Sequence, residues 1–162
     1  MSEGQVLQAE KGVRRFKEPA LVRHQDAVRF LWGDEESHQV YDWIYGRGDR
    51  ISALIFSLRP GEYFKSSKTW KPLYNQDRFY YVLQGQLAIQ DPGSGEVTLA
   101  HEGEAIYWSS LRWHYGYNFG EQETLVLDWY APPERAGSIP EVVASEKKED
   151  LAQEIGGRYE LL

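Results

Sequence analysis

The stretch RFYYVLQGQLAI, from Arg78 to Ile89, determines how the rest of the sequence is interpreted. It holds two short runs rich in β-branched and aromatic residues, which favour strands, on either side of a glycine that marks a bend. The first run begins with an arginine, although most of the following residues are apolar. Because side chains alternate between the two faces of a strand, Arg78, Tyr80 and Val82 are predicted to share one face.

Similar short runs recur on both sides of this segment, separated by strong turn signals. The breakers RPGE, DPGSGE, EGE and NFGE divide the middle of the chain at short intervals, with apolar and aromatic runs between them. This spacing is typical of an all-β sandwich or barrel. The chain has 162 residues, a length that suits one domain with a substantial core.

Composition excludes several classes of function. Cysteine is absent, which rules out disulfides, thiolate nucleophiles and thiolate metal sites. The net charge of −7, without a basic block, argues against nucleic-acid binding. No apolar run is long enough to span a membrane, and the first residues do not resemble a signal peptide. We therefore expect a cytoplasmic protein that handles a small molecule.

The organisation along the chain predicts a central barrel with an extension at each end. The N-terminal extension should contribute strands at residues 27–32 and 39–46, and the segment SEKKEDLAQEI predicts a short C-terminal helix with Ser145 as its N-cap. The expected regions are residues 1–49 as an N-terminal extension that packs on the barrel, 50–133 as the barrel, and 134–162 as a C-terminal tail.

Two pieces of the barrel region carry a resemblance to a known family. RFYYVLQGQLAI is similar to the end of the first motif of the cupin superfamily, and GEAIYWSSLRWHYGYN keeps Gly103, His114 and Asn118 of the second motif. The resemblance extends from Pro60 to Pro133 and is closest to small single-domain cupins. It implies a jelly-roll β-barrel of two antiparallel sheets.

The departures from the family pattern concern its metal site. Metal-binding cupins usually hold the ion with histidines and a glutamate, but Arg78 stands at the glutamate position and KPLYN at the positions of the paired histidines. His114 is the one expected ligand that remains, while Ser109 and Leu111 replace the usual proline and glycine. One imidazole does not hold a divalent ion without further ligands. The resemblance thus predicts a barrel with no metal and no other cofactor.

The predicted site consists of residues expected to face the barrel interior. A buried guanidinium requires an anionic partner, and for Arg78 this is either Asp128 on the closing strand or an anionic group of the ligand. His114 is a candidate acid or base because imidazole titrates near neutral pH, and its alternative role is purely structural. The predicted catalytic residues are His114, Arg78 and Tyr80. The predicted ligand-binding residues are Tyr63, Trp108, Asp128, Tyr130, Trp70 at the mouth of the pocket, and Asn118, whose alternative role is structural, at a turn or strand end.

Three functions are compatible with this pattern. The first is a metal-independent cupin that binds a small anionic or aromatic molecule, with proton-transfer chemistry of the isomerase, cyclase or lyase type if it is an enzyme. The second is a metal-dependent enzyme, such as a dioxygenase, that uses His114 with Asp128 or Glu62. The third is a non-catalytic binding or sensor protein. Aromatic residues in excess of one barrel face also predict a homodimer, with contacts around VYDWIYG.

Overall fold

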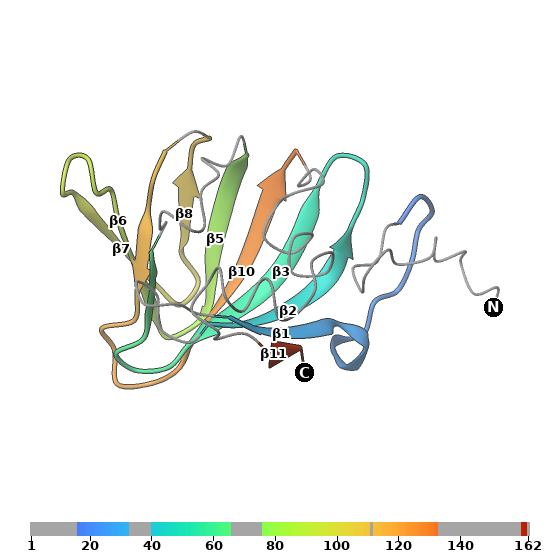
Figure 1. Cartoon of the computed structure of the whole chain (residues 1–162), viewed down its shortest axis with the longest axis horizontal. Helices are drawn as coiled ribbons and strands as arrows, with labels where there is room; N and C mark the ends of the chain where they lie inside the picture. Colours follow the sequence, from blue (N-terminus) through green and yellow to red (C-terminus); the bar gives the residue numbers. More distant parts are fainter. Residues whose placement is uncertain (1–15, 33–39, 66–75, 111, 133–159, 162) are drawn as a thin grey trace.

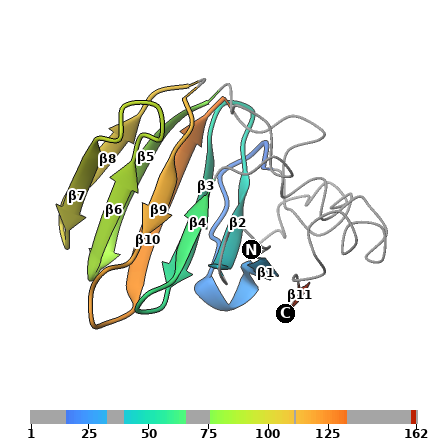
Figure 2. The ribbon, with the colours of Figure 1, turned by 60° about the vertical axis from the view of Figure 1, so that its left-hand side comes forward.

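The computed structural model describes residues 16–32, 40–65, 76–110, 112–132 and 160–161. Within these residues the backbone is almost entirely strand, and Figures 1 and 2 show two antiparallel sheets packed face to face. The large sheet has the strand order β11-β1-β2-β3-β10-β5-β8 and the small sheet the order β4-β9-β6-β7. The strands are β1 (Val28–Trp32), β2 (Val40–Arg47), β3 (Ser52–Leu58), β4 (Tyr63–Lys65), β5 (Asp77–Gln84), β6 (Gln86–Gln90), β7 (Val97–His101), β8 (Ala105–Trp108), β9 (Tyr115–Tyr117), β10 (Thr124–Ala131) and β11 (Glu160–Leu161).

This architecture confirms the all-β fold expected from the sequence. The helical content of the described residues is a 3-10 turn, η2 (His24–Asp26), and none of these residues forms a helix long and apolar enough to cross a membrane. The segment 133–159, which includes the helix predicted around Ser145, lies outside the described residues.

The core lies between the sheets and follows the alternation of each strand. On β5, Arg78, Tyr80 and Val82 are 8%, 2% and 0% exposed, whereas Phe79 on the opposite face is 48% exposed. The expected inner face of this strand is therefore confirmed. Inward residues of the large sheet meet those of the small sheet in one apolar cluster that includes Phe56, Val126, Phe64, Leu87 and Ile89.

Two glycines are required by close approaches of the backbone. Gly85, between β5 and β6, has a φ of +79°, and a Cβ there would lie 3.1 Å from the Glu123 carbonyl oxygen and 3.1 Å from the Thr124 hydroxyl. Gly116, in the middle of β9, lies under the ring of Phe64, which a Cβ at that position would overlap. Gly116 thus allows Phe64 to reach across the small sheet toward the interior.

The two strands expected in the N-terminal extension are present as β1 and β2. They continue the large sheet, because β2 pairs with β3 in a register that sets Trp43 opposite Ile55, and β1 pairs with β2. Residues 160–161 of the tail add β11 to the free edge of β1. The strands outside the barrel region therefore form a single hydrogen-bonded sheet with it.

Candidate functional site

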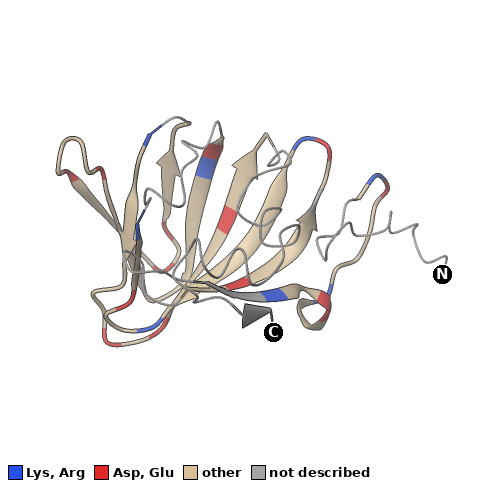
Figure 3. Ribbon diagram, in the orientation of Figure 1, with Lys and Arg blue, Asp and Glu red and all other residues tan. Residues whose placement is uncertain are grey.

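An ion pair lies inside the barrel, on the neighbouring strands β5 and β10. The Arg78 guanidinium donates from Nη1 to Oδ2 of Asp128 at 2.6 Å, and both side chains are buried. In the ladder Tyr130 faces Arg78 and Asp128 faces Tyr80, so the pair is diagonal. Figure 3 shows that β5 and β10 are mostly tan, with few charged bands.

Two further contacts hold the Arg78 side chain in place. Its Nη2 donates to Oε1 of Gln76 at 2.8 Å, and the amide of Gln76 donates in turn to the Pro132 carbonyl oxygen at 3.0 Å. On one face, the Arg78 guanidinium carbon lies 4.6 Å from the centre of the Tyr130 ring, which is a cation–π contact. The charge of Arg78 is therefore balanced and its plane is fixed within the protein.

A second polar contact, between Tyr80 and His114, lies close to the ion pair. The Tyr80 hydroxyl and Nε2 of His114 are 2.6 Å apart in a buried hydrogen bond. Three aromatic rings surround the imidazole, with centroid distances of 5.3 Å to Trp108, 5.6 Å to Tyr80 and 5.8 Å to Phe64. Trp108 and Tyr80 come from the large sheet and Phe64 from the small sheet, so both sheets contribute to the group of rings around His114.

This environment keeps His114 neutral. Burial is the largest cause that lowers its pKa, and the positive charge of Arg78 is the second; a hydrogen bond with the Arg112 backbone opposes both. Together they lower the pKa of His114 to about 3. At neutral pH the imidazole is thus an uncharged hydrogen-bond partner and has little tendency to take up a proton.

Six of the predicted site residues are brought together in the barrel interior by these contacts. They are Arg78, Tyr80, Trp108, His114, Asp128 and Tyr130. Of the two partners proposed for Arg78, the structure places the internal one, Asp128, in contact with it. Trp70 lies outside the described residues.

Two predicted ligand-binding residues lie away from this cluster. On β4 the buried residue is Phe64, so Tyr63 points to the outer face, where its ring lies 5.7 Å from Tyr117. The amide of Asn118 donates to the carbonyl oxygens of Leu58 and Gln122 and accepts from the backbone N–H of Gly120. Asn118 therefore holds the β9–β10 turn, and we leave both residues out of the candidate site.

Gln76 and Phe64 belong to the cluster but were not predicted from the sequence. Gln76 is two residues before Arg78, so the alternation that placed Arg78 inside could also have placed Gln76 there. Phe64 lies on a strand of three residues, which is too short to show an alternation. The outer position of Tyr63 was missed for the same reason.

The described residues do not assemble a metal site. No group of three or more His, Cys, Asp and Glu side chains is placed to hold an ion in the part of the chain that the structure describes. Asp128, one of the carboxylates expected to join His114 in a metal site, is paired with Arg78. The acceptor that a metal would use is thus engaged by a cation.

The strand order and the interior site define the class of fold: the chain has the cupin fold. Similar solved structures include a predicted oxalate decarboxylase from Thermotoga maritima, with 15% identity, a TM-score of 0.57 and coverage of 69% of this chain and 98% of that one. KdgF from Halomonas sp. has 16% identity and a TM-score of 0.55 over 72% of this chain and 96% of its own. An RmlC-like cupin from Shewanella frigidimarina has 11% identity and a TM-score of 0.54 over 73% and 95%.

The likeness to known proteins establishes the fold of this chain but not its function. No protein-family model matches the sequence, and neither does any curated protein. At identities of 11–16% the likeness to these solved structures concerns the course of the backbone. The function must therefore be argued from the side chains of this chain.

Proposed function

We propose that this chain is a metal-independent cupin that binds a small aromatic molecule inside its barrel. The observation that carries the proposal is the buried Arg78–Asp128 ion pair beside the Tyr80–His114 hydrogen bond. Arg78 stands where a metal-binding cupin is expected to carry a glutamate, and a fixed cation repels a divalent ion at short range. The site therefore favours an organic ligand over a metal ion.

A neutral aromatic ligand fits the site better than an anionic one. The charge of Arg78 is already balanced by Asp128 at 2.6 Å, so an anionic ligand would have to displace that carboxylate. The side chains around the imidazole, Trp108, Tyr80 and Phe64, offer flat apolar surfaces of the kind that bind aromatic rings. A phenol-like hydroxyl on the ligand would complement the Tyr80–His114 pair.

In this proposal Tyr80 and His114 orient the ligand by hydrogen bonding. A His114 whose pKa is lowered to about 3 remains neutral at physiological pH, and with the Tyr80 hydroxyl that it bonds it forms an uncharged polar group. Such a group recognises a hydroxyl or N–H at low electrostatic cost. Binding is therefore better supported than acid catalysis by a protonated histidine.

The test combines elemental analysis with ligand binding. Protein purified without a histidine tag should carry no stoichiometric iron, manganese, nickel or zinc, and ligand-observed NMR should detect phenol but not benzoate. Tyr80→Phe should weaken phenol binding, whereas Tyr81→Phe, on the opposite face of β5, should not. A stoichiometric metal that is lost in His114→Ala would overturn the proposal, and so would unchanged phenol binding in Tyr80→Phe.

A proton-transfer enzyme is the second candidate, and the short Tyr80–His114 bond favours it. The Tyr80 hydroxyl, which lies 2.6 Å from Nε2 of the neutral His114, would exchange a proton with a bound ligand. The reaction would be an isomerisation, cyclisation or lyase step with Arg78 near the developing negative charge. Exchange of a ligand C–H proton with solvent D2O, observed by NMR and abolished by Tyr80→Phe, would support this function; its absence for every bound ligand would exclude it.

A further inference from the structure

A cavity of about 230 Å³ lies between the edge strands β7 and β8, beside the β6–β7 hairpin. Trp108 forms the wall between this cavity and the barrel interior, because its indole lines the cavity while its ring lies 5.3 Å from His114. The cavity is thus separate from the site proposed above. Its lining residues are Asp91, Glu96, Thr98, Tyr107, Trp108, Ser109 and Arg112.

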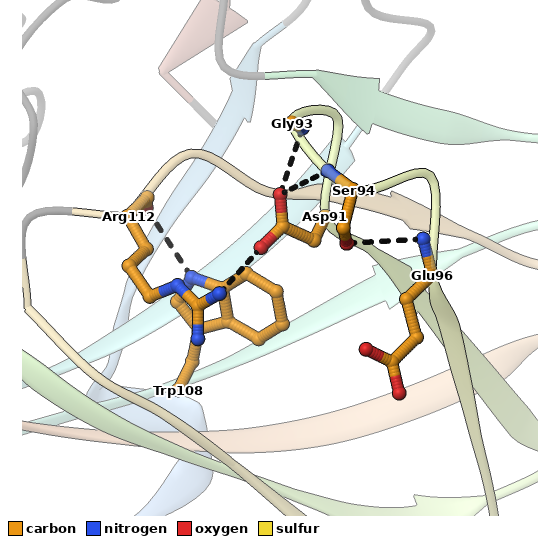
Figure 4. Close-up of polar contacts among 6 residues, drawn as sticks. All are labelled: Asp91, Gly93, Ser94, Glu96, Trp108 and Arg112. Carbon is orange, nitrogen blue, oxygen red and sulfur yellow. Dashed lines mark hydrogen bonds and ion pairs between the residues drawn. The ribbon is translucent and has the colours of Figure 1, made fainter.

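One wall of the cavity is a fixed guanidinium. Arg112 donates from Nη2 to Oδ2 of Asp91 at 2.8 Å, and its guanidinium carbon lies 5.7 Å from the centre of the Trp108 ring (Figure 4). The other oxygen of Asp91 accepts from the backbone N–H groups of Gly93 and Ser94, and the first of these bonds is the largest cause that lowers the pKa of Asp91. Arg112 is thus held by a carboxylate that stays ionised.

Arg112 still has donors to offer. A guanidinium carries about five N–H groups, and the bond to Asp91 uses one of them. Its side chain is 59% exposed, which leaves the remaining donors accessible. A planar guanidinium whose orientation is already fixed loses little entropy when it binds a second carboxylate.

The Glu96 side chain supplies an acceptor on the other strand of the hairpin. The backbone N–H of Glu96 donates to the Ser94 hydroxyl at 3.2 Å, which fixes Glu96 directly before β7 (Figure 4). Among the described residues, its carboxylate forms no hydrogen bond or ion pair. The cavity therefore combines free donors on Arg112 with a free carboxylate on Glu96, and the hydroxyls of Thr98 and Ser109 also line it.

We propose that this cavity binds a small zwitterion of the α-amino acid class. The ligand carboxylate pairs with Arg112, its ammonium group pairs with Glu96, and its side chain packs on the ring of Tyr107. Two carboxylates and one guanidinium line the cavity, so a simple anion is repelled. A simple amine would leave the Arg112 donors unused. A neutral polyol would form neither of the charge-assisted hydrogen bonds, to Arg112 or to Glu96.

The test compares three probes of matched shape: L-leucine, isopentylamine, which lacks the carboxylate, and 4-methylpentanoate, which lacks the amine. Binding to the full chain is measured by calorimetry and by the NMR shift of the assigned Trp108 indole N–H. We expect L-leucine to bind about tenfold or more tightly than either partner, because each lacks one charge-assisted hydrogen bond. Equal affinity for the amine and L-leucine would overturn the proposal, as would preferential binding of xylitol, a polyol of similar size.

Matched variants assign the two contacts. Glu96→Gln and Arg112→Lys should each weaken L-leucine binding about tenfold, the latter because lysine keeps the charge near Asp91 but loses the planar fork. Glu102→Gln removes an exposed carboxylate that does not line the cavity, and should leave affinity unchanged. A loss of affinity in Glu102→Gln equal to that in Glu96→Gln would show a general charge effect and refute the site.

Discussion

The Arg78 side chain has three partners that together neutralise it inside a β-barrel. Asp128 balances the charge, Gln76 accepts a second N–H, and Tyr130 covers one face of the guanidinium. Removing one member of a buried ion pair leaves the other charge without compensation, which costs far more than replacing both members. The contribution of Arg78 to the free energy of unfolding therefore depends on the presence of Asp128.

A double-mutant cycle should reveal this coupling. Arg78→Met is expected to lower the free energy of unfolding by about 3–5 kcal/mol, because it leaves the Asp128 carboxylate buried beside a thioether. Adding Asp128→Asn to Arg78→Met should recover part of that loss. Urea unfolding of the four proteins measures the coupling. Additive losses would mean that Arg78 and Asp128 do not interact.

Acidification should destabilise the protein through His114. The pKa of this residue is ordinarily 6.5 and is lowered to about 3 in the folded state, so between these pH values the unfolded chain binds the extra proton. The contribution is complete above pH 6.5 and declines by up to about 1.4 kcal/mol per pH unit as the pH falls toward 3.

The measurement is the free energy of unfolding of wild type and His114→Gln between pH 4 and 7. The variant should show a shallower loss at low pH, since glutamine does not titrate. Identical slopes for wild type and His114→Gln would contradict the shift.

At the scale of elements, the small strands β4 and β9 determine how His114 is enclosed. Phe64 on β4 crosses over Gly116 on β9 and packs edge-on against the imidazole, at a centroid distance of 5.8 Å. A Cβ on residue 116 would overlap the Phe64 ring, so the glycine and the phenylalanine form one packing unit. The Phe64 ring can therefore occupy this position only because residue 116 has no side chain.

Gly116→Ala should lower the free energy of unfolding by about 1–3 kcal/mol, the usual range for overpacking. Combining it with Phe64→Leu should cost less than the sum of the two changes, because the smaller side chain makes room for the methyl group. Gly48→Ala is the control, since a Cβ there meets its nearest atom at an ordinary 3.7 Å. Additivity of the two core changes would show that the ring and the glycine are not coupled.

The same elements show how far sequence reasoning reached. Alternation along the eight residues of β5 placed Arg78, Tyr80 and Val82 inside, and β10 supplied Asp128 as expected. The three residues of β4 are too few to show an alternation, so the sequence does not predict that Tyr63 lies on the outer face. The sequence also does not predict the cavity beside the β6–β7 hairpin, because Arg112 and Asp91 come together only when the loops fold.

At the scale of the whole molecule, the outer face of the large sheet is an apolar surface. Phe79, Tyr107 and Trp129 form one cross-strand row over β5, β8 and β10, with 48%, 52% and 39% exposure. The predicted contact around VYDWIYG is partly covered, because the His24 ring lies 5.6 Å from Trp43 and bonds the Tyr45 hydroxyl. We propose the row of Phe79 as a second candidate for the homodimer contact, beside the contact predicted around VYDWIYG.

Light scattering should report a mass near twice 18.8 kDa at micromolar concentration. Phe79→Lys should convert the dimer to a monomer, since it adds a charge to the centre of the row. Leu99→Lys is a matched control on β7 of the small sheet, because Leu99 and Phe79 have the same 48% exposure. A wild-type mass of 18.8 kDa would refute the dimer, and equal dissociation by both variants would refute this interface.

The strand order of the large sheet also determines when the chain can fold. Strand β10 lies between β3 and β5, so Tyr130 pairs with Ser52 and Arg78, which precede it by many residues in the sequence. During synthesis the central strand of the sheet therefore emerges after both of its neighbours. Until residue 131 has left the ribosome, β3 and β5 each lack the neighbour that pairs with one of their edges, and unpaired edges and apolar faces favour aggregation over that interval.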